Sequence, residues 1–186
     1  DYSVESINYY SLDDIEKIIS KYKDINIFIS INKNIFNSDI KPLKEILKKI
    51  DSLQIKGIFY YDLAILNLKK ELNLKTDLVW NSTFMVTNYK TCNYYYKKLV
   101  KYALISKEIT KDEIIEIIKN TEITPIVELI SYPIVAFSKR TLVANYYRNY
   151  ELSKQDDINI IEPKSRQAYY LKENEFGTSF ILDKLM

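Results

Sequence analysis

Short runs of mostly apolar, often β-branched residues recur along this chain of 186 residues, and a segment with helical spacing follows each of them. The runs span residues 25–31, 55–61, 78–80, 102–106 and 125–130. Such unbroken apolar runs are typical of strands that are buried on both faces of a parallel sheet. Because strands that alternate with helices form right-handed βαβ units, the sequence predicts an α/β fold with a parallel sheet.

The intervening segments carry their apolar residues at helical spacing, and polar residues stand where helices would begin. Ser11 precedes Asp13 and Asp14, which favours a capped helix start. Thr110 and Glu113 have the spacing of a capping box. We expect helices over residues 13–21, 42–50, 63–72, 89–98, 111–119 and 138–147.

The pattern changes after residue 150, where a polar stretch leads into short strand-like runs. Asn174 and Gly177 bound a tight-turn signal between the last two runs, which indicates a β-hairpin. We therefore expect two parts, a main domain over 1–150 and a C-terminal tail with a β-hairpin over 151–186. The hairpin could close the domain as an ordinary surface element, or act as a lid or a partner-binding edge.

Composition excludes several kinds of site. The chain has one cysteine, Cys92, and no histidine, so it offers neither a four-cysteine iron–sulfur site nor a histidine-based zinc site, and we expect no metal site. The net charge is only +2, and the 17 tyrosines are most simply explained by packing. No apolar run approaches about 18 residues and no signal peptide is visible, so we expect a cytoplasmic protein without a membrane span.

Each predicted strand ends in polar residues. In chain order these are Asn32, then Asp62, then Asn81, Ser82 and Thr83, then Lys107 and Glu108, and finally Ser131. Because the carboxyl ends of parallel strands meet at one edge of a sheet, these residues are candidates for a shared binding site. The alternative is that they cap helices and satisfy loop amides, as Asp62 and Asn81 could do.

Three segments resemble those of peptidase family U32, the collagenase-like proteins. They run over residues 80–96 (WNSTFMVTNYKTCNYYY), 103–114 (ALISKEITKDEI) and 131–147 (SYPIVAFSKRTLVANYY). The resemblance implies a partial barrel of the TIM type, although the pattern alone also fits an open α/β sheet. It also implies that the chain lacks the strand, helix and strand with which the family's barrel begins. Arg140, in Ser138-Lys139-Arg140, matches the family's basic motif and could hold an anion together with nearby helix amides.

The chain departs from the family where catalysis would be expected. The family's His-Gly pair falls on Ile130 and Ser131, and its nearby cysteine falls on Ile134. Lys107 also replaces an arginine, which removes bidentate recognition of a carboxylate. Chemistry that needs histidine, or a cysteine paired with histidine, is therefore impossible in this chain.

The family resemblance implies functions of two kinds. Some members are collagenase-like peptidases, whereas others take part in RNA hydroxylation, for which a prephenate-like small acid is implicated. We expect an accessory protein of RNA hydroxylation, in particular of tRNA, that is not an independent catalyst. The alternatives are a peptidase that uses other residues, and a non-catalytic scaffold that docks a paralogous U32 subunit.

Overall fold

The computed structural model describes residues 10–82, 85–130, 132, 134–153, 158–174 and 177–182. The chain forms two compact units, one that ends at Val127 and another that begins at Glu128. Within the described ranges, no helix is both long enough and apolar enough to span a membrane.

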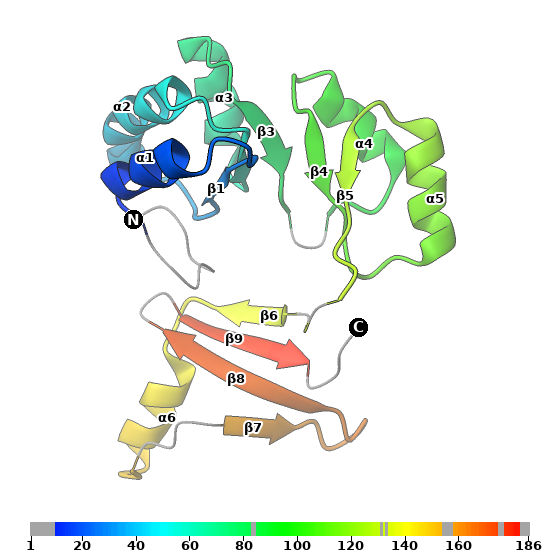
Figure 1. Ribbon diagram of the computed structural model, residues 1–186. Helices are drawn as coiled ribbons and strands as arrows, with labels where there is room; N and C mark the ends of the chain where they lie inside the picture. Colours follow the sequence, from blue (N-terminus) through cyan, green and yellow to red (C-terminus); the bar gives the residue numbers. More distant parts are fainter. Residues whose placement is uncertain are drawn as a thin grey trace. The chain divides into compact units, whose positions relative to one another are not determined.

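The first unit is built on a five-stranded parallel sheet in which the strands lie side by side in chain order (Figure 1). The strands are β1 (Phe28–Ile31), β2 (Gly57–Tyr60), β3 (Asp77–Trp80), β4 (Tyr102–Leu104) and β5 (Thr124–Ile126). This arrangement confirms the predicted α/β class and the predicted order of parallel strands.

Helices precede β1 and connect all the strands of this sheet. They are α1 (Leu12–Lys21), α2 (Asn37–Ser52), α3 (Leu63–Leu72), α4 (Tyr89–Tyr96) and α5 (Lys111–Asn120). The capping box at Thr110 is confirmed, since the Thr110 amide donates to Glu113 Oε2 at 2.7 Å. α2 begins earlier than expected because the Asp39 carboxylate accepts the Phe36 amide at 3.0 Å, and the helix runs through Pro42.

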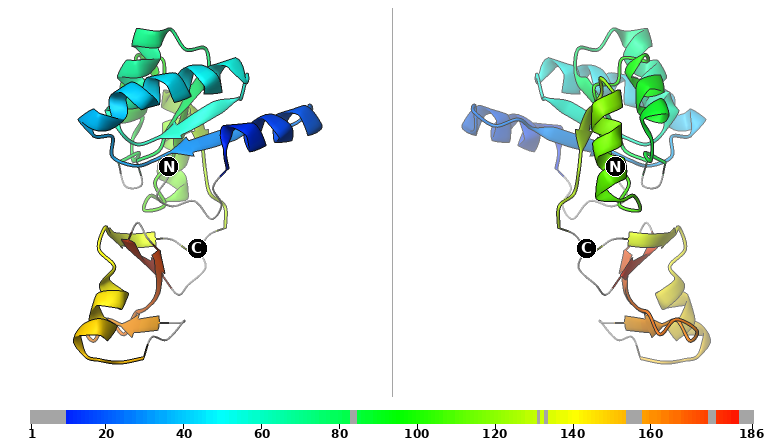
Figure 2. Two further views of the ribbon diagram at one scale, coloured as in Figure 1. Left: turned by 90° about the vertical axis from the view of Figure 1, so that its left-hand side faces the viewer. Right: turned by 90° about the vertical axis from the view of Figure 1, so that its right-hand side faces the viewer.

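The core lies on one face of the sheet. Ile31, Tyr60, Trp80 and Ala103 are register partners on neighbouring strands, so they point to the same side, and all four are buried. Leu43, Leu47, Ile65 and Cys92 of α2, α3 and α4 join them in one cluster. α1 contributes only partly buried residues, and Figure 2 shows it extending outward from the rest of this unit.

The opposite face of the sheet carries an aromatic cluster. The Phe28 ring lies 5.8 Å from that of Phe59 and 5.9 Å from that of Tyr102. A Cβ added to Gly57 would lie 2.8 Å from the Phe28 ring. Phe28 therefore packs over Gly57, and only a residue without a side chain leaves that space open.

The second unit is a four-stranded antiparallel sheet with one helix. Its strand order is β6 (Ile134–Ser138), β9 (Gly177–Leu182), β8 (Ala168–Asn174) and β7 (Ile158–Ile161). α6 (Leu142–Asn149) packs on β8 and β9. The expected hairpin is present, since Asn174 and Gly177 are partners across β8 and β9. β6 was not predicted. We had assigned its residues to the main domain, but β6 pairs with β9 and so belongs to the same sheet as the C-terminal strands.

Candidate functional site

Most of the predicted site residues lie at one edge of the parallel sheet. Asn32 follows β1, Asp62 follows β2, and Asn81 and Ser82 follow β3. Lys107 and Glu108 lie in the connection between β4 and α5. Because the strands are parallel, all of these positions are at their carboxyl ends. Thr83 and Ser131 lie outside the described residues, and Arg140 belongs to the second unit.

Asp62 connects two loops through its carboxylate. Oδ1 accepts the amide of Ala64 at 2.9 Å, which caps α3, and Oδ2 accepts the amide of Ile35 at 2.9 Å, in the connection from β1 to α2. Both carboxylate oxygens therefore bind the backbone. The capping role that the sequence left open for Asp62 is present, and it fixes the spacing of two neighbouring loops.

Backbone hydrogen bonds hold the next two loops together. The Asn81 amide donates to the Tyr60 carbonyl at 2.9 Å, and the Ser106 amide donates to the Val86 carbonyl at 3.0 Å. Ser82 and Ser106 are each only 4% exposed. The Ser106 hydroxyl also accepts the Glu108 amide at 3.3 Å, so it serves to shape the loop. These serines are therefore poorly placed to attack a substrate from solvent.

The more accessible members of this edge are Asn32, Asn81, Lys107 and Glu108, which are partly buried or exposed. They provide two amides, one cation and one carboxylate. Such a set can orient a small polar or anionic molecule, since amides donate and accept hydrogen bonds and the ammonium attracts negative charge. Among the described residues, no three Asp, Glu or Cys side chains are grouped as metal ligands would be.

The single thiol is unsuited to nucleophilic chemistry. Cys92 lies on α4 and is completely buried. Burial raises the pKa of its thiol to about 11, so the reactive thiolate is scarce at neutral pH. With no histidine in the chain, the usual partner for a cysteine or serine nucleophile is absent as well.

The start of α6 differs from our expectation for Arg140. The amides of Val143 and Ala144 donate to the Glu173 carboxylate at 2.8 and 2.9 Å. The Leu142 amide donates to the Thr178 hydroxyl at 3.0 Å. The helix amides that we expected to assist anion binding beside Arg140 are therefore occupied by the protein itself. Glu173 lies on β8, far along the chain, so no local pattern could have revealed this contact.

A cleft of about 810 Å³ lies at the other end of the sheet, where β1, β2 and β3 begin. The connections that lead into these three strands line it. Asp51 and Thr76 in its wall are hydrogen-bonded to each other, with Thr76 Oγ1 2.6 Å from Asp51 Oδ1. The cleft is thus separate from the polar residues at the carboxyl ends of the strands.

Comparison with known proteins gives a consistent assignment. The model of peptidase family U32 matches residues 6–174. A tRNA hydroxylation protein P2 of Bacillus subtilis is 25% identical across 95% of this chain, which spans 60% of that relative. An uncharacterized protease of Methanocaldococcus jannaschii is 26% identical across 82% of the chain and 37% of its own length. A solved U32 peptidase structure shares the fold, with a TM-score of 0.51 and 15% identity over 77% of this chain and 60% of that one.

Proposed function

The chain belongs to peptidase family U32, and from that premise we propose that it serves in tRNA hydroxylation as an accessory protein. The observation that carries this proposal is the similarity to a tRNA hydroxylation protein along 95% of the chain. The chain spans 60% of that relative, so the proposal concerns a part of the machinery and does not assign a complete activity to these residues.

The chemistry of the strand-end residues supports binding more than catalysis. The chain has no histidine, its only thiol is buried with a raised pKa, and Ser82 and Ser106 are almost inaccessible. Peptide hydrolysis requires a nucleophile or an activated water and a group that transfers protons. The accessory role requires only that the protein positions RNA, a small acid or another subunit.

The proposal names three kinds of partner. RNA is the first, because the Bacillus subtilis relative is named for tRNA hydroxylation. A paralogous U32 subunit is the second, since a catalyst must be supplied. The third is a small anion, such as a prephenate-like acid, for which Lys107 and Asn81 are our candidate ligands on neighbouring loops. The cytoplasm, where tRNA is modified, is the compartment in which all three would be met.

A genetic experiment tests the proposed function. The gene is deleted from the organism that carries it, total tRNA is digested, and hydroxylated nucleosides are quantified by liquid chromatography and mass spectrometry. We expect the hydroxylated nucleosides to fall and to recover when the gene is returned. An unchanged level in the deletion strain would contradict the proposal.

A peptidase is the second candidate, and the similarity to a protein named as a protease is what favours it. The purified protein is incubated with gelatin and casein, alongside a Ser82→Ala variant. We expect no cleavage by either protein. Cleavage that disappears in the variant would promote the peptidase and would show that Ser82, buried here, becomes accessible in an active state.

A further inference from the structure

One stretch of the first unit is basic over an unusual length. Between Asp77 and Glu108 the sequence contains no acidic residue, but it contains Lys90, Lys97, Lys98, Lys101 and Lys107. The chain as a whole has a net charge of only +2. The positive charge is therefore concentrated in α4 and its flanking connections and is balanced elsewhere by acidic residues.

Lys90 lies on α4 and Lys97 and Lys98 directly follow it, and this helix also carries exposed aromatic rings. Lys90 and Tyr94 are four residues apart on α4, so they lie on the same side of the helix, and Lys97 and Lys98 lie in the turn that follows it. Lys98 Nζ lies 5.6 Å from the centroid of the Tyr94 ring. Tyr94 is 58% exposed and Tyr96 is 44% exposed. By contrast, Tyr95 stacks on buried Trp80 with the ring centroids 4.1 Å apart, which is the ordinary packing role.

Three of the lysines keep their charge unpaired. Lys101 pairs with Asp77 at 3.1 Å, whereas Lys90, Lys97 and Lys98 take part in no ion pair among the described residues. α5 packs beside α4 and carries Asp112, Glu113 and Glu116, none of which forms an ion pair with these lysines. Its Glu113 is engaged at the start of its own helix by Thr110. The ends of lysine side chains on α4 are thus available to an external anion.

We propose that the surface formed by Lys90 and Tyr94 on α4, and by Lys97 and Lys98 in the turn after it, binds single-stranded RNA. The lysines would contact phosphates and the Tyr94 ring would stack on a base, which is the combination that sequence-independent single-strand binding uses. The choice of RNA as the ligand rests on the proposed function in tRNA hydroxylation. An acidic protein would match the lysines, but it would leave the exposed ring of Tyr94 without a specific role.

The position of α4 connects this surface with the strand-end residues. Asn88 caps α4 by accepting the Thr91 amide at 2.9 Å, and Lys90 lies in the first turn of the helix. The loop that leads into α4 from β3 begins with Asn81 and Ser82. An RNA strand held along α4 therefore reaches the carboxyl edge of the sheet, where the polar residues lie.

Fluorescence anisotropy tests the proposal directly. The probe is a labelled tRNA anticodon stem-loop, titrated with purified protein over a series of salt concentrations. For single strands, the logarithm of affinity falls with the logarithm of salt with a slope of about −0.7 for each phosphate contact. The triple variant Lys90→Gln, Lys97→Gln, Lys98→Gln should therefore weaken binding and reduce the slope by about 2. Tyr94→Ala should weaken binding about tenfold and leave the slope unchanged.

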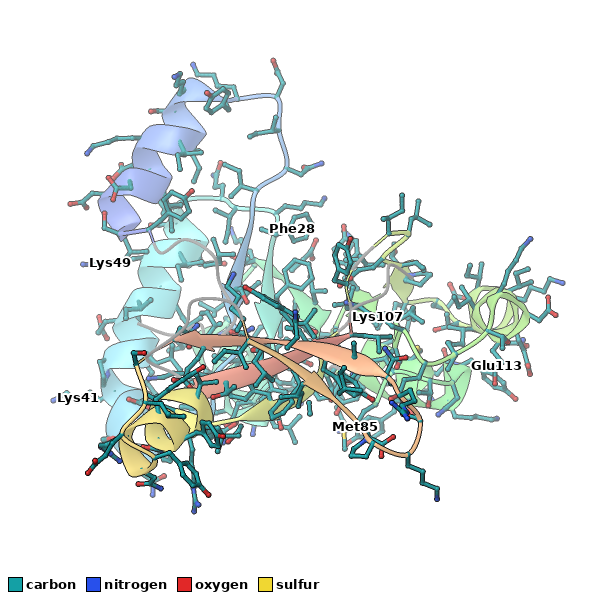
Figure 3. The ribbon with its side chains drawn as sticks, turned by 90° about the horizontal axis from the view of Figure 1, so that it is seen from below. Phe28, Lys41, Lys49, Met85, Lys107 and Glu113 are labelled. Carbon is teal, nitrogen blue, oxygen red and sulfur yellow. The ribbon has the colours of Figure 1, made fainter. Side chains whose placement is uncertain are left out.

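Matched controls separate this surface from a general effect of charge. Lys41, Lys49 and Lys70 are exposed lysines on α2 and α3, and Figure 3 shows Lys41 and Lys49 on the outer side of α2. Replacing these three by glutamine removes the same charge and should leave the slope unchanged. Tyr22 is 49% exposed on another part of this unit, and Tyr22→Ala should bind as the parent does. Thermal unfolding should show the same melting temperature for all variants.

The outcomes are decisive in both directions. The proposed surface is wrong if the parent protein does not bind RNA at low salt. It is also wrong if the α4 triple variant and the control triple variant lose the same amount of RNA affinity. Loss confined to the α4 variants supports it, even when deletion of the gene leaves tRNA hydroxylation intact. In that case the proposed function fails and the RNA-binding surface remains.

Discussion

Two charged side chains from different helices hold the loop that precedes β3. Asp51 of α2 accepts the amides of Lys75 and Thr76 at 2.8 and 2.7 Å. Lys69 of α3 donates to the carbonyls of Leu74 and Thr76 at 2.9 and 2.5 Å. Burial alone would raise the pKa of Asp51, but the hydrogen bonds from Thr76 and Lys75 outweigh it and the pKa falls below its usual value. Both residues thus use charge to satisfy backbone groups that would otherwise lack partners.

We expect Asp51→Ala to lower the free energy of unfolding at pH 7 by about 1–3 kcal/mol, because it leaves the loop amides without an acceptor. The folded-state pKa of Asp51 is depressed, so its ionised form stabilises the fold above the unfolded-state pKa of about 3.9. That contribution is lost as the pH falls through the folded-state pKa. The difference between parent and variant should therefore shrink in acid.

Urea unfolding followed by circular dichroism at pH 7 and near pH 3 measures this difference. Asp24→Ala, at an exposed position before β1, is the control and should change stability by less than about 0.5 kcal/mol. If Asp51→Ala lowers the free energy of unfolding by the same amount at both pH values, the charge of Asp51 makes no contribution to stability.

Cys92 provides a second prediction at the scale of a single residue. Because the thiol is fully buried and its pKa is raised to about 11, Ellman's reagent should not modify it in the native protein. Addition of denaturant should release one thiol per chain, in agreement with the single cysteine of the sequence. Rapid modification of the native protein would mean that α4 separates readily from the sheet.

At the scale of elements, side chains from distant strands complete several helices and turns. Glu173 of β8 caps α6, and Asp62 ties the start of α3 to the connection before α2. Gly177 allows β9 to approach the end of β6, since a Cβ there would lie 2.0 Å from the Ser138 carbonyl oxygen. Its φ of +144° is also one that residues with side chains rarely adopt. The chain has only two glycines, and at each of them an added Cβ would come within 3.0 Å of another atom.

We therefore expect Gly177→Ala to disrupt the pairing of β6 with β9. Hydrogen exchange with mass spectrometry should show lost protection in peptides of the second unit, while peptides that contain β2 and β3 retain theirs. Gly57→Ala is the informative comparison, because its Cβ meets the ring of Phe28, which can move, as well as the Asp77 carbonyl oxygen at 3.2 Å. That variant should lose about 1–3 kcal/mol from overpacking and remain folded. Full protection in Gly177→Ala would contradict the steric argument.

At the scale of the whole molecule, the candidate binding residues and the charged residues that stabilise loops lie at opposite ends of the parallel sheet. The carboxyl edge of the parallel sheet holds amides, Lys107 and Glu108, while the partly buried charges of Asp51 and Lys69 at the other end stabilise loops. The potential metal ligands of this chain are carboxylates and carbonyl oxygens, which suit hard cations such as Mg²⁺ or Ca²⁺ more than zinc or iron.

Elemental analysis of the purified protein should accordingly find neither zinc nor iron in stoichiometric amount. The physical reason is that both metals favour imidazole or thiolate ligands, and the chain offers no histidine and one buried thiol. Samples are dialysed without chelator and measured by plasma mass spectrometry, with the buffer as the blank. One tightly held zinc per chain would contradict the prediction.

The sequence by itself determined the features that depend on neighbours in the chain. Apolar runs fixed the existence and order of β1 to β5, and local hydrogen bonds fixed the starts of α1 and α5 at Ser11 and Thr110. The placement of Asn81 and Lys107 at one edge followed from the parallel order alone. These predictions succeeded because periodicity and capping act over a few residues.

Tertiary structure decided the remainder. β6 forms because β9 supplies its partner, although residues 134–138 do not alternate clearly between apolar and polar. The amides near Arg140 are occupied by Glu173, some 30 residues later in the chain, and Asp62 reaches back to Ile35. Contacts of this kind depend on which segments the folded chain brings together. They leave no periodic trace in the sequence, because a single polar pair satisfies each of them.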